Sequence, residues 1–499
     1  MTIAGPDWHS GAVTERHSQR SVRWLLLALV VLVGTAYTPA LHGTGAAAHL
    51  AVRPTAAQSK LPALSHDGRW FTDPSGRVVM LRGMNFVEKF APYTPEADGF
   101  NDDDAALLVA NGFNTIRLGV PFGFLMPKPG HIDRTYLSSI ARTVGILRRH
   151  HIYVLLDFHQ DGWGPVTNGN GMPAWATYTD GLPNPPDPFP TYYVTNPALQ
   201  RAFDNFWANR AGPNGVPLQT YYAQGMAAVA KRLASSVNVI GYEAMNEPWP
   251  GTNWKSCATG CPDLEASLLA PFYARMTAAV HAVDPIHPVF VEPFVLFNFG
   301  GTDTSLPGAA SGDELSTHVY ATNAAANASV MDRSVLAAVR DSAALLVTEW
   351  GAITDPAAIT QTEDQFDARL VPWLFWSYNG LVVGDSNQPL VAPNLNVPVL
   401  DALTRPYPSV VNGTPTYLNY DTASATLYAA YSTRRPDGRR APQTLDTVVN
   451  VPARSYPSGY AVTAVGAVVT SAPCSPSLTL RNQPGATSVV FRVTPAACP

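Results

Sequence analysis

Two glutamates follow apolar segments that are typical of buried strands. Glu247 stands between Asn246 and Pro248 at the end of one such segment, and Glu349 ends another that starts at Leu345. Because Pro248 cannot donate to a sheet ladder and disfavours a helical residue before it, we expect the first strand to end there. In one parallel barrel, both carboxylates would meet at the carboxyl-terminal mouth. Such a pair can hydrolyse a glycosidic bond with retention, with Glu247 as acid/base and Glu349 as nucleophile; a structural turn at either glutamate is the alternative.

Other polar side chains stand in or just after predicted strands. Arg117 lies within an apolar strand, where a cation needs a carboxylate partner, and Glu349 is the natural candidate. Asn246 is placed to hold a sugar 2-hydroxyl as the transition state develops. Trp376 lies near the end of the last predicted strand, where its ring could stack on a pyranose. His159, His318 and Tyr320 also stand at predicted strand ends, where they could bind sugar hydroxyls or orient the nucleophile. Each histidine alone could equally be a core residue.

Other chemistries find little support in the sequence. It contains no G-x-S-x-G elbow, no H-E-x-x-H motif and no phosphate-binding Walker loop. The acidic triplet Asp102–Asp104 precedes an apolar segment and is interpreted as a helix start rather than as a metal site. With a net charge of −5 and 14 % charged residues, the chain lacks a basic block for nucleic acid. We therefore expect a neutral or weakly polar substrate, no cofactor and no catalytic metal.

The elements that must position these residues alternate along the chain. Near-continuous apolar runs are separated by segments with apolar residues at helical spacing, as in a parallel sheet buried on both faces. The runs are residues 78–86, 114–120, 152–157, 239–245, 288–292, 315–320, 345–349 and 372–378. This order predicts a (β/α)8 TIM barrel over residues 60–403, with a hairpin around Asp73–Gly76 at its start. From residue 404 to 499, short strands between turns predict an antiparallel β-sandwich, interpreted as support rather than as a binding module.

The first 48 residues have the pattern of a secretory signal. Three arginines precede the unbroken apolar run Trp24–Val33, and small residues follow, with Ala46–Ala48 as a candidate cleavage site. A membrane anchor is the alternative, but this run is shorter than the roughly 20 residues that a spanning helix needs. We therefore expect a secreted protein.

Four cysteines follow this segment, at positions Cys257, Cys261, Cys474 and Cys498. An even number in an oxidising compartment indicates two disulfides, for which three pairings are possible. Proximity in the sequence favours Cys257–Cys261 and Cys474–Cys498. A zinc site is the weaker interpretation, because no histidine cluster accompanies the C-x3-C spacing.

Taken together, these motifs resemble glycoside hydrolase family 5, whose members are retaining (β/α)8 enzymes. The matching segments are Ile116–Leu118, His159, Asn246–Pro248, His318–Tyr320, Glu349–Gly351 and Trp376–Ser377. One subgroup, the endoglycoceramidases, is similar at further positions, namely residues 85–93, 157–161, 173–176 and 246–251. This resemblance implies sugar contacts for Lys89, Asp161 and Trp175. Over residues 60–499 it also implies a C-terminal β-sandwich and hydrolysis of the bond between an oligosaccharide and ceramide.

The resemblance leaves several substrates open, from oligosaccharides linked to ceramide through glucose or galactose to glucosylceramide and steryl glucosides. The segment Tyr178–Val194 lies where specificity for the sugar would be set. Residues 293–299 and 121–127 are candidates for an apolar, lipid-binding mouth, with ordinary loop packing as the alternative. We expect a monomer that acts on a glycolipid with transient contact to a membrane or micelle. A β-glucanase of the same chemistry and a non-catalytic glycan-binding barrel are the alternatives.

Overall fold

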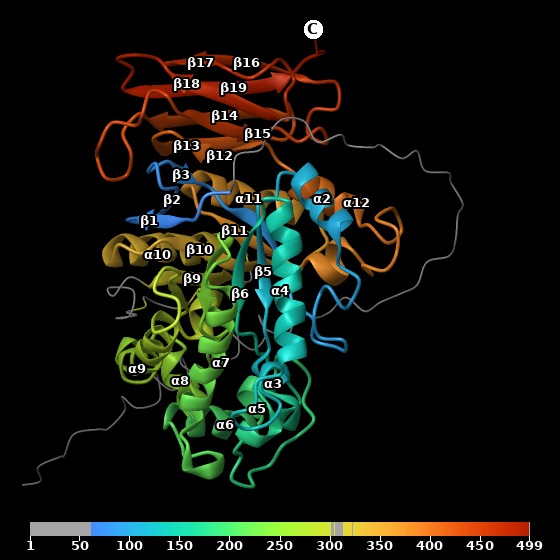
Figure 1. Cartoon of the computed structure of the whole chain (residues 1–499), viewed down its shortest axis with the longest axis vertical. Helices are drawn as coiled ribbons and strands as arrows, with labels where there is room; N and C mark the ends of the chain where they lie inside the picture. The colour runs from blue at the N-terminus through green and yellow to red at the C-terminus, as the bar shows by residue number, and fades with distance from the viewer. Residues whose placement is uncertain (1–60, 301–303, 305–312, 322, 499) are drawn as a thin grey trace, which may run out of the picture.

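The computed structural model describes residues 61–300, 304, 313–321 and 323–498, so the predicted signal segment lies outside the described residues. Within the described part, eight parallel strands close a barrel in the order β10-β11-β4-β5-β6-β7-β8-β9 (Figure 1). Their bounds are β4 Arg82–Phe86, β5 Thr115–Gly119, β6 Tyr153–Asp157, β7 Val239–Glu243, β8 Val289–Val291, β9 Glu314–Val319, β10 Leu345–Gly351 and β11 Trp373–Trp376. The predicted TIM barrel is confirmed.

Helices follow the strands and surround the barrel, with short turns of helix in the loops. The helices are α2 Asp102–Ala110, α3 Phe122–Leu125, α4 Arg134–Arg149, α5 Tyr192–Thr195, α6 Pro197–Trp207, α7 Leu218–Leu233, α8 Trp254–Cys257, α9 Pro262–His281, α10 Ala324–Asp341, α11 Pro356–Arg369 and α12 Val397–Leu403. The acidic triplet begins α2: the Asn101 side chain accepts from the Asp103 N–H, and Asp104 accepts from the Asn101 N–H. The predicted helix start is confirmed. No described helix is long and apolar enough to span a bilayer.

Two strand predictions need correction. Residues 78–86 do not form one strand, because Val78–Val79 form β3, which pairs antiparallel with β12 outside the barrel, and the barrel strand starts at Arg82. An apolar run does not reveal which sheet each half joins. The strand expected to reach Pro248 ends earlier, at Glu243, so that Glu247 lies in the loop that follows β7. This loop takes Glu247 into a left-handed backbone conformation with φ of 43°, which a strand cannot contain.

Strands from both ends of the chain build the second unit. One sheet has the order β1-β2-β3-β12-β15-β18-β17 and the other β13-β14-β19-β16. Their bounds are β1 Ser65–Asp67, β2 Trp70–Thr72, β3 Val78–Val79, β12 Tyr407–Val411, β13 Thr414–Asp421, β14 Thr426–Ser432, β15 Asp446–Asn450, β16 Tyr460–Val465, β17 Ala467–Val469, β18 Ser477–Asn482 and β19 Ser488–Pro495. The predicted β-sandwich is confirmed, and β1 to β3, which lie in the segment predicted for the barrel, extend one of its sheets.

The sandwich lies against the amino-terminal end of the barrel. Phe71 of β2 stacks on Phe290 of β8 at 6.2 Å between ring centres and closes that end. The junction also contains buried ion pairs of Arg82 with Asp367 and of Arg405 with Glu363. In Figure 1 the sandwich strands lie at one end of the molecule, and α3, α5 and α6 lie at the other. The sandwich is thus remote from the carboxyl ends of the barrel strands.

Both favoured disulfides are present. The pair Cys257–Cys261 links α8 to the start of α9, and Cys474–Cys498 ties the C-terminal segment to the sandwich.

Candidate active site

The polar residues predicted from the sequence converge at the carboxyl ends of the barrel strands. Parallel strands place all these ends at one mouth, so side chains that are distant in the sequence meet there. The residues and their elements are Lys89 after β4, Arg117 in β5, His159 and Asp161 after β6, Asn246 and Glu247 after β7, His318 in β9, Tyr320 after β9, Glu349 in β10 and Trp376 at the end of β11.

Arg117 is a fully buried cation that connects several strands. Its guanidinium donates to Glu243 of β7 and to Glu349 of β10. Its Nη2 lies 3.1 Å from Asp157 Oδ1 and donates to the side-chain oxygen of Asn246 at 2.8 Å. Burial alone would lower the pKa of Arg117, but the surrounding carboxylates raise it well above its ordinary value. The contact expected between Arg117 and Glu349 is therefore present.

Glu349 receives two hydrogen bonds that favour its anion. Arg117 donates to Oε1, and the Tyr320 hydroxyl donates to Oε2 at 3.0 Å. Both donors stabilise the negative charge that a nucleophilic carboxylate must carry. The side chain is mostly buried and still lines the cavity at the barrel mouth.

Glu247 has a different environment. Its Oε1 lies 2.9 Å from Nδ1 of His318, and its backbone carbonyl accepts from the Gln160 amide at 3.0 Å. Burial, reinforced by the charge of Asp161, raises the pKa of Glu247 to about 7. A carboxyl that stays protonated near neutral pH can act as a general acid. The environment of Glu247 thus favours a protonated acid, and that of Glu349 favours a charged nucleophile.

The two carboxyl groups are close together. One oxygen of Glu247, one oxygen of Glu349 and a ring nitrogen of His318 all lie within 4.8 Å of one another. Retaining glycosidases hold their carboxyl groups about 5–5.5 Å apart, whereas inverting enzymes leave about 6.5–9.5 Å for a water molecule. The separation favours direct attack by a carboxylate on the sugar.

A chain of charged side chains extends from the barrel interior to the mouth. The ring nitrogens of His159 lie 2.7 Å from Asp157 and 3.1 Å from Asp161. Lys89 Nζ lies 2.5 Å from Asp161 Oδ2 and 4.5 Å from the ring centre of Trp376. Trp376 also stacks with His159 at 5.5 Å. This chain fixes an indole face and two charged groups beside the carboxylate pair.

Charge is maintained along this chain despite its burial. Burial alone would lower the pKa of His159, but Asp157 and Asp161 raise it to about 9. Burial would raise the pKa of Asp161, but Lys89 and His159 hold it well below its ordinary value. Charged groups of both signs bind sugar hydroxyls strongly when they are fixed in place.

A cavity of about 150 Å³ contains both glutamates. Its polar lining consists of Lys89, Asp161, Glu247, Tyr320 and Glu349, together with the ring of Trp376. Apolar and aromatic side chains complete the wall, namely Phe189, Pro190, Tyr193, Trp249, Val295, Phe299 and Ala352. One of the two predicted apolar segments, residues 293–299, therefore contributes to the cavity. The segment 178–194 contributes three residues to the same wall.

Comparison with known sequences decides the family. The family described as Cellulase (glycosyl hydrolase family 5) matches residues 72–381. The chain belongs to glycoside hydrolase family 5. A second description, the glycoside hydrolase family 5 C-terminal domain, matches residues 405–494. The protein is thus a family 5 glycoside hydrolase, and this family acts with retention, as the barrel and its two glutamates suggested.

Relatives of this family 5 enzyme include endoglycoceramidases. Endoglycoceramidase I of Rhodococcus hoagii (strain 103S) is 31 % identical over 440 residues, which cover 82 % of this chain and 84 % of the relative. Endo-glycoceramidase II from Rhodococcus sp., solved as a lactosyl-enzyme intermediate, has a TM-score of 0.70 at 29 % identity and covers 87 % of this chain and 100 % of that chain. The structure of its complex with ganglioside GM3 has a TM-score of 0.69 at 28 % identity, and the match covers 86 % of this chain and 99 % of that chain.

Two sequence predictions lie away from this cavity. The indole N–H of Trp175 donates to the Met126 carbonyl at 3.0 Å, and its ring packs edge-on against Phe122 and Tyr221. The described side chains that line the cavity do not include Trp175 or residues 121–127. Phe122 and Leu125 are buried in the barrel core instead, so the packing alternative describes this second apolar segment.

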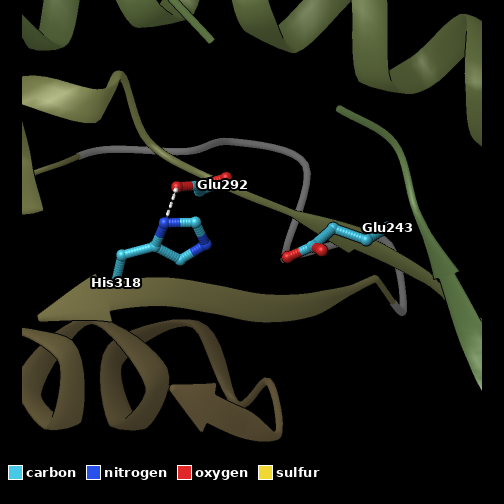
Figure 2. A group of neighbouring side chains, drawn as sticks. All are labelled: Glu243, Glu292 and His318. Carbon is cyan, nitrogen blue, oxygen red and sulfur yellow. Dashed lines mark ion pairs between the residues drawn. The ribbon is translucent and has the colours of Figure 1, made fainter. Parts of the chain in front are cut away.

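Several residues of the family 5 enzyme's site were not predicted. Asn85 donates to the Thr348 carbonyl at 2.9 Å and accepts from Arg117 at 3.0 Å. Glu243 contacts Arg117 and accepts from the Thr348 hydroxyl at 2.9 Å. Glu292 and Glu243 lie beside His318, with one ligand atom of each within 4.8 Å of the others (Figure 2). These residues could have been predicted from the sequence, because each is a charged or amide residue in or beside an apolar run, as Arg117 is.

Two groups of side chains around His318 have ligand atoms within 4.8 Å of one another and could geometrically hold a metal ion: Glu243, Glu292 and His318, and Glu247, His318 and Glu349. Internal donors already engage these oxygens. Arg117 donates to Glu243 and Glu349, and Glu292 accepts the backbone N–H of Glu247. That the enzyme needs no metal stays a prediction.

Proposed function

We propose that this family 5 enzyme hydrolyses the β-glycosidic bond between the oligosaccharide and the ceramide of glycosphingolipids. The observation that carries the proposal is the mixed lining of the cavity. Charged groups and the Trp376 ring suit a sugar, whereas Phe189, Val295 and Phe299 suit a lipid. A substrate that is polar on one side of the scissile bond and apolar on the other matches both. The endoglycoceramidases among its relatives, and the ganglioside bound to one of them, support this choice.

The proposed mechanism uses both glutamates in two steps. The Glu349 carboxylate attacks the anomeric carbon while Glu247 gives its proton to the leaving ceramide oxygen, which forms a glycosyl ester on Glu349. Glu247, now ionised, then removes a proton from water, and the resulting hydroxyl attacks the same carbon and displaces the Glu349 carboxylate. The sugar leaves with retained configuration, and each glutamate returns to its starting protonation state. No cofactor takes part.

The remaining site residues are assigned to substrate binding. We assign Lys89, Asp161 and Trp376 to the sugar that is cleaved from the lipid, because they border the cavity beside the carboxylates. Asn246 is assigned to the 2-hydroxyl, with Arg117 holding its side-chain oxygen at 2.8 Å. His159 orients Asp161, and His318 and Tyr320 orient the glutamates. Trp175 stays a prediction for a more distant sugar.

Activity is expected to decrease as the pH rises through about 7. The pKa of Glu247 is about 7, so this group is protonated below that pH and loses its proton above it. Because the first step needs the protonated acid, kcat/KM should be highest below neutral pH and decrease tenfold for each pH unit well above the pKa. A pH series of kcat/KM with an aryl lactoside of poor leaving ability measures this. A profile that stays flat up to pH 9 would assign the acid role to another group.

Two exposed phenylalanines at the mouth are expected to contact the lipid surface. Phe189 lines the cavity and is 44 % exposed, and Phe90, next to Lys89, is 80 % exposed. Changing both to serine should lower hydrolysis of lactosylceramide in vesicles about 30-fold, because partial burial of each ring contributes on the order of 1 kcal/mol. Hydrolysis of a soluble aryl lactoside should decrease much less, because only Phe189 of the two lines the cavity.

Leu336 offers the matched control for this prediction. It is 66 % exposed on α10, apart from the cavity lining. Leu336→Ser should leave both activities at the wild-type level. Equal losses on the vesicle and soluble substrates in the double phenylalanine variant would contradict a surface-contact role.

The proposed substrate is tested with a panel of lipids. Purified enzyme is incubated with lactosylceramide, ganglioside GM3, galactosylceramide, glucosylceramide, a steryl glucoside and a β-glucan, and the products are identified by mass. Release of intact oligosaccharide and ceramide is expected. Hydrolysis of the steryl glucoside alone, or of β-glucan but none of the lipids, would instead favour one of the alternative substrates.

We also propose that the enzyme is exported and monomeric. The charged and apolar N-terminal segment and the two disulfides suit an oxidising compartment. Recovery from the culture medium of a protein shortened near Ala46–Ala48, with the mass of one chain in solution, is the expected result. Retention of full-length protein in the membrane fraction would favour the anchor alternative.

A further inference from the structure

A third carboxyl group lies beneath the acid/base. Glu292 directly follows β8 and has no exposed surface. Its Oε2 accepts the backbone N–H of Glu247 at 2.8 Å. Its Oε1 lies 3.5 Å from Nδ1 of His318 and accepts from the Asn298 amide at 3.3 Å. Figure 2 shows Glu292 beside the His318 ring and Glu243 to the right of both.

The hydrogen bond to the Glu247 amide supports an uncommon backbone conformation. Glu247 has φ of 43°, and Pro248 follows it. A non-glycine residue in the left-handed region persists only where its surroundings hold it. The Glu292 carboxyl holds the N–H of Glu247, and the Gln160 amide holds its carbonyl at 3.0 Å. Glu292 therefore helps to fix the position of the Glu247 backbone, and with it the position of the acid/base side chain.

The surroundings of Glu292 favour its neutral form. Burial, with the charges of Glu243 and Glu247 added, raises the pKa of Glu292 well above its ordinary value, against smaller lowerings by Arg117 and by the hydrogen bond from the Glu247 N–H. Within the described residues, the ion pairs of Arg117 go to Asp157, Glu243 and Glu349 and not to Glu292. The other groups that face Glu292 are the neutral Asn298 amide and the hydroxyl of Tyr273 of α9, which donates to its backbone carbonyl at 2.6 Å.

His318 carries the one ring proton that all these carboxyls can share. Burial lowers the pKa of His318 to about 4, so the ring is neutral in the working range. Its Nδ1 lies 2.9 Å from Glu247, 3.5 Å from Glu292 and 3.7 Å from Glu349. In the proposed mechanism, the negative charge moves from Glu349 to Glu247 and back. An ionised Glu292 would compete for the same N–H and oppose both states.

We propose that Glu292 is a positioning residue for the acid/base: as a neutral carboxylic acid it fixes the Glu247 backbone and leaves the His318 Nδ1–H free to stabilise Glu247 when that group ionises. This inference rests on the proposed roles of Glu247 and Glu349 and not on the identity of the lipid. Glu292 keeps its own proton through both steps, so the proton balance of the reaction is unchanged. It acts through Glu247 and does not touch the substrate.

Two substitutions separate this role from simple core packing. Glu292→Gln keeps a neutral side chain with an oxygen that can accept the Glu247 N–H, and we expect kcat/KM within about threefold of wild type with an unchanged alkaline limb. Glu292→Leu removes that acceptor. We expect it to lower kcat/KM about 100-fold on aryl lactosides with poor leaving groups, because displacement of an acid costs roughly this much. On dinitrophenyl lactoside, which leaves without protonation, the loss should be less than about fivefold.

Glu314 is the matched control. It is a buried glutamate that also accepts a backbone N–H, from Ala344 at 2.5 Å, but it begins β9 at the opposite end of the barrel. Glu314→Gln and Glu314→Leu should show the same dependence on the leaving group as wild type, whatever stability they lose. Thermal melting of each variant shows that folded protein is compared.

Two results would overturn the proposal. Loss of 100-fold or more in Glu292→Gln would mean that the ionised carboxylate is needed, and this test remains decisive even if Glu292→Leu does not fold. Equal losses on good and poor leaving groups in Glu292→Leu would reduce Glu292 to a packing role. Because aryl lactosides contain no ceramide, failure of the glycolipid proposal would leave these results interpretable, whereas failure of Glu247 as acid would appear in the wild-type pH profile.

Discussion

Glu349→Ser is expected to abolish turnover, with kcat lowered roughly 10⁴-fold to 10⁶-fold, the range seen when a nucleophile is removed from other hydrolases. The serine hydroxyl is too short to reach the anomeric carbon and has no base to activate it. Substrate binding should persist, because Lys89, Asp161 and Trp376 are untouched. Steady-state kinetics on an aryl lactoside, with titration of Trp fluorescence by intact glycolipid, measures both quantities.

The Glu349→Ser variant must also keep its fold, which depends on whether the buried cation of Arg117 stays paired. In the variant, Arg117 still contacts Glu243 and Asp157, so the buried cation remains paired and the fold should be kept. A thermal melting curve close to that of wild type is expected. Residual activity above about 1 % that survives further purification would remove Glu349 from the mechanism.

Glu247→Ala should produce the second largest effect, and it should depend on the substrate. Hydrolysis of a glycolipid or of an aryl lactoside with a poor leaving group should fall about 10²-fold to 10⁴-fold, the usual contribution of a general acid. Dinitrophenyl lactoside should still form the glycosyl ester quickly, because its leaving group needs no proton, and the ester should then accumulate. A burst of dinitrophenol followed by slow turnover is the expected time course.

Added azide distinguishes this interpretation from misfolding. Azide attacks the glycosyl ester without a general base, so it should restore turnover of dinitrophenyl lactoside by the Glu247→Ala variant and release β-lactosyl azide. The wild-type enzyme should form little of this product. An α-lactosyl azide, or no rescue by azide, would contradict the assignment of Glu247 as acid/base of a retaining enzyme.

The strands were predictable because buried parallel strands need continuous apolar residues, and runs such as Leu345–Val347 meet that need. Sheet membership was not predictable at β3 and β4, since no turn residue separates Val79 from Arg82 in the sequence. The end of β7 at Glu243 was not predictable from Pro248, because the loop between them takes Glu247 into a left-handed conformation whose backbone hydrogen bonds come from Glu292 and Gln160, in other parts of the chain. The sequence around Pro248 predicts that a loop follows the strand but does not give the residue at which the strand ends.

The catalytic candidates were predictable from their position at strand ends, whereas their supports were not. Glu243 and Glu292 lie in or directly beside strands, where a sequence offers no means to say which acid is ionised; that depends on Arg117 and His318, which come from other strands. Phe122 shows the complementary error, because its segment looks like part of a lipid-binding mouth by its place after a strand, but its ring packs in the barrel core, edge-on to Trp175. The sugar contact of Trp175 stays a prediction.

The most direct measurement is the mass of the peptide that carries the sugar during turnover. The enzyme is incubated with a 2-deoxy-2-fluoro lactoside that has a dinitrophenyl leaving group, digested, and its peptides are sequenced by mass spectrometry. The fluorine slows both steps, and the good leaving group lets the ester form and persist. We predict one fluorolactosyl group, attached to Glu349. A label on Glu247, on another residue or on none while the unmodified lactoside is hydrolysed would contradict the account.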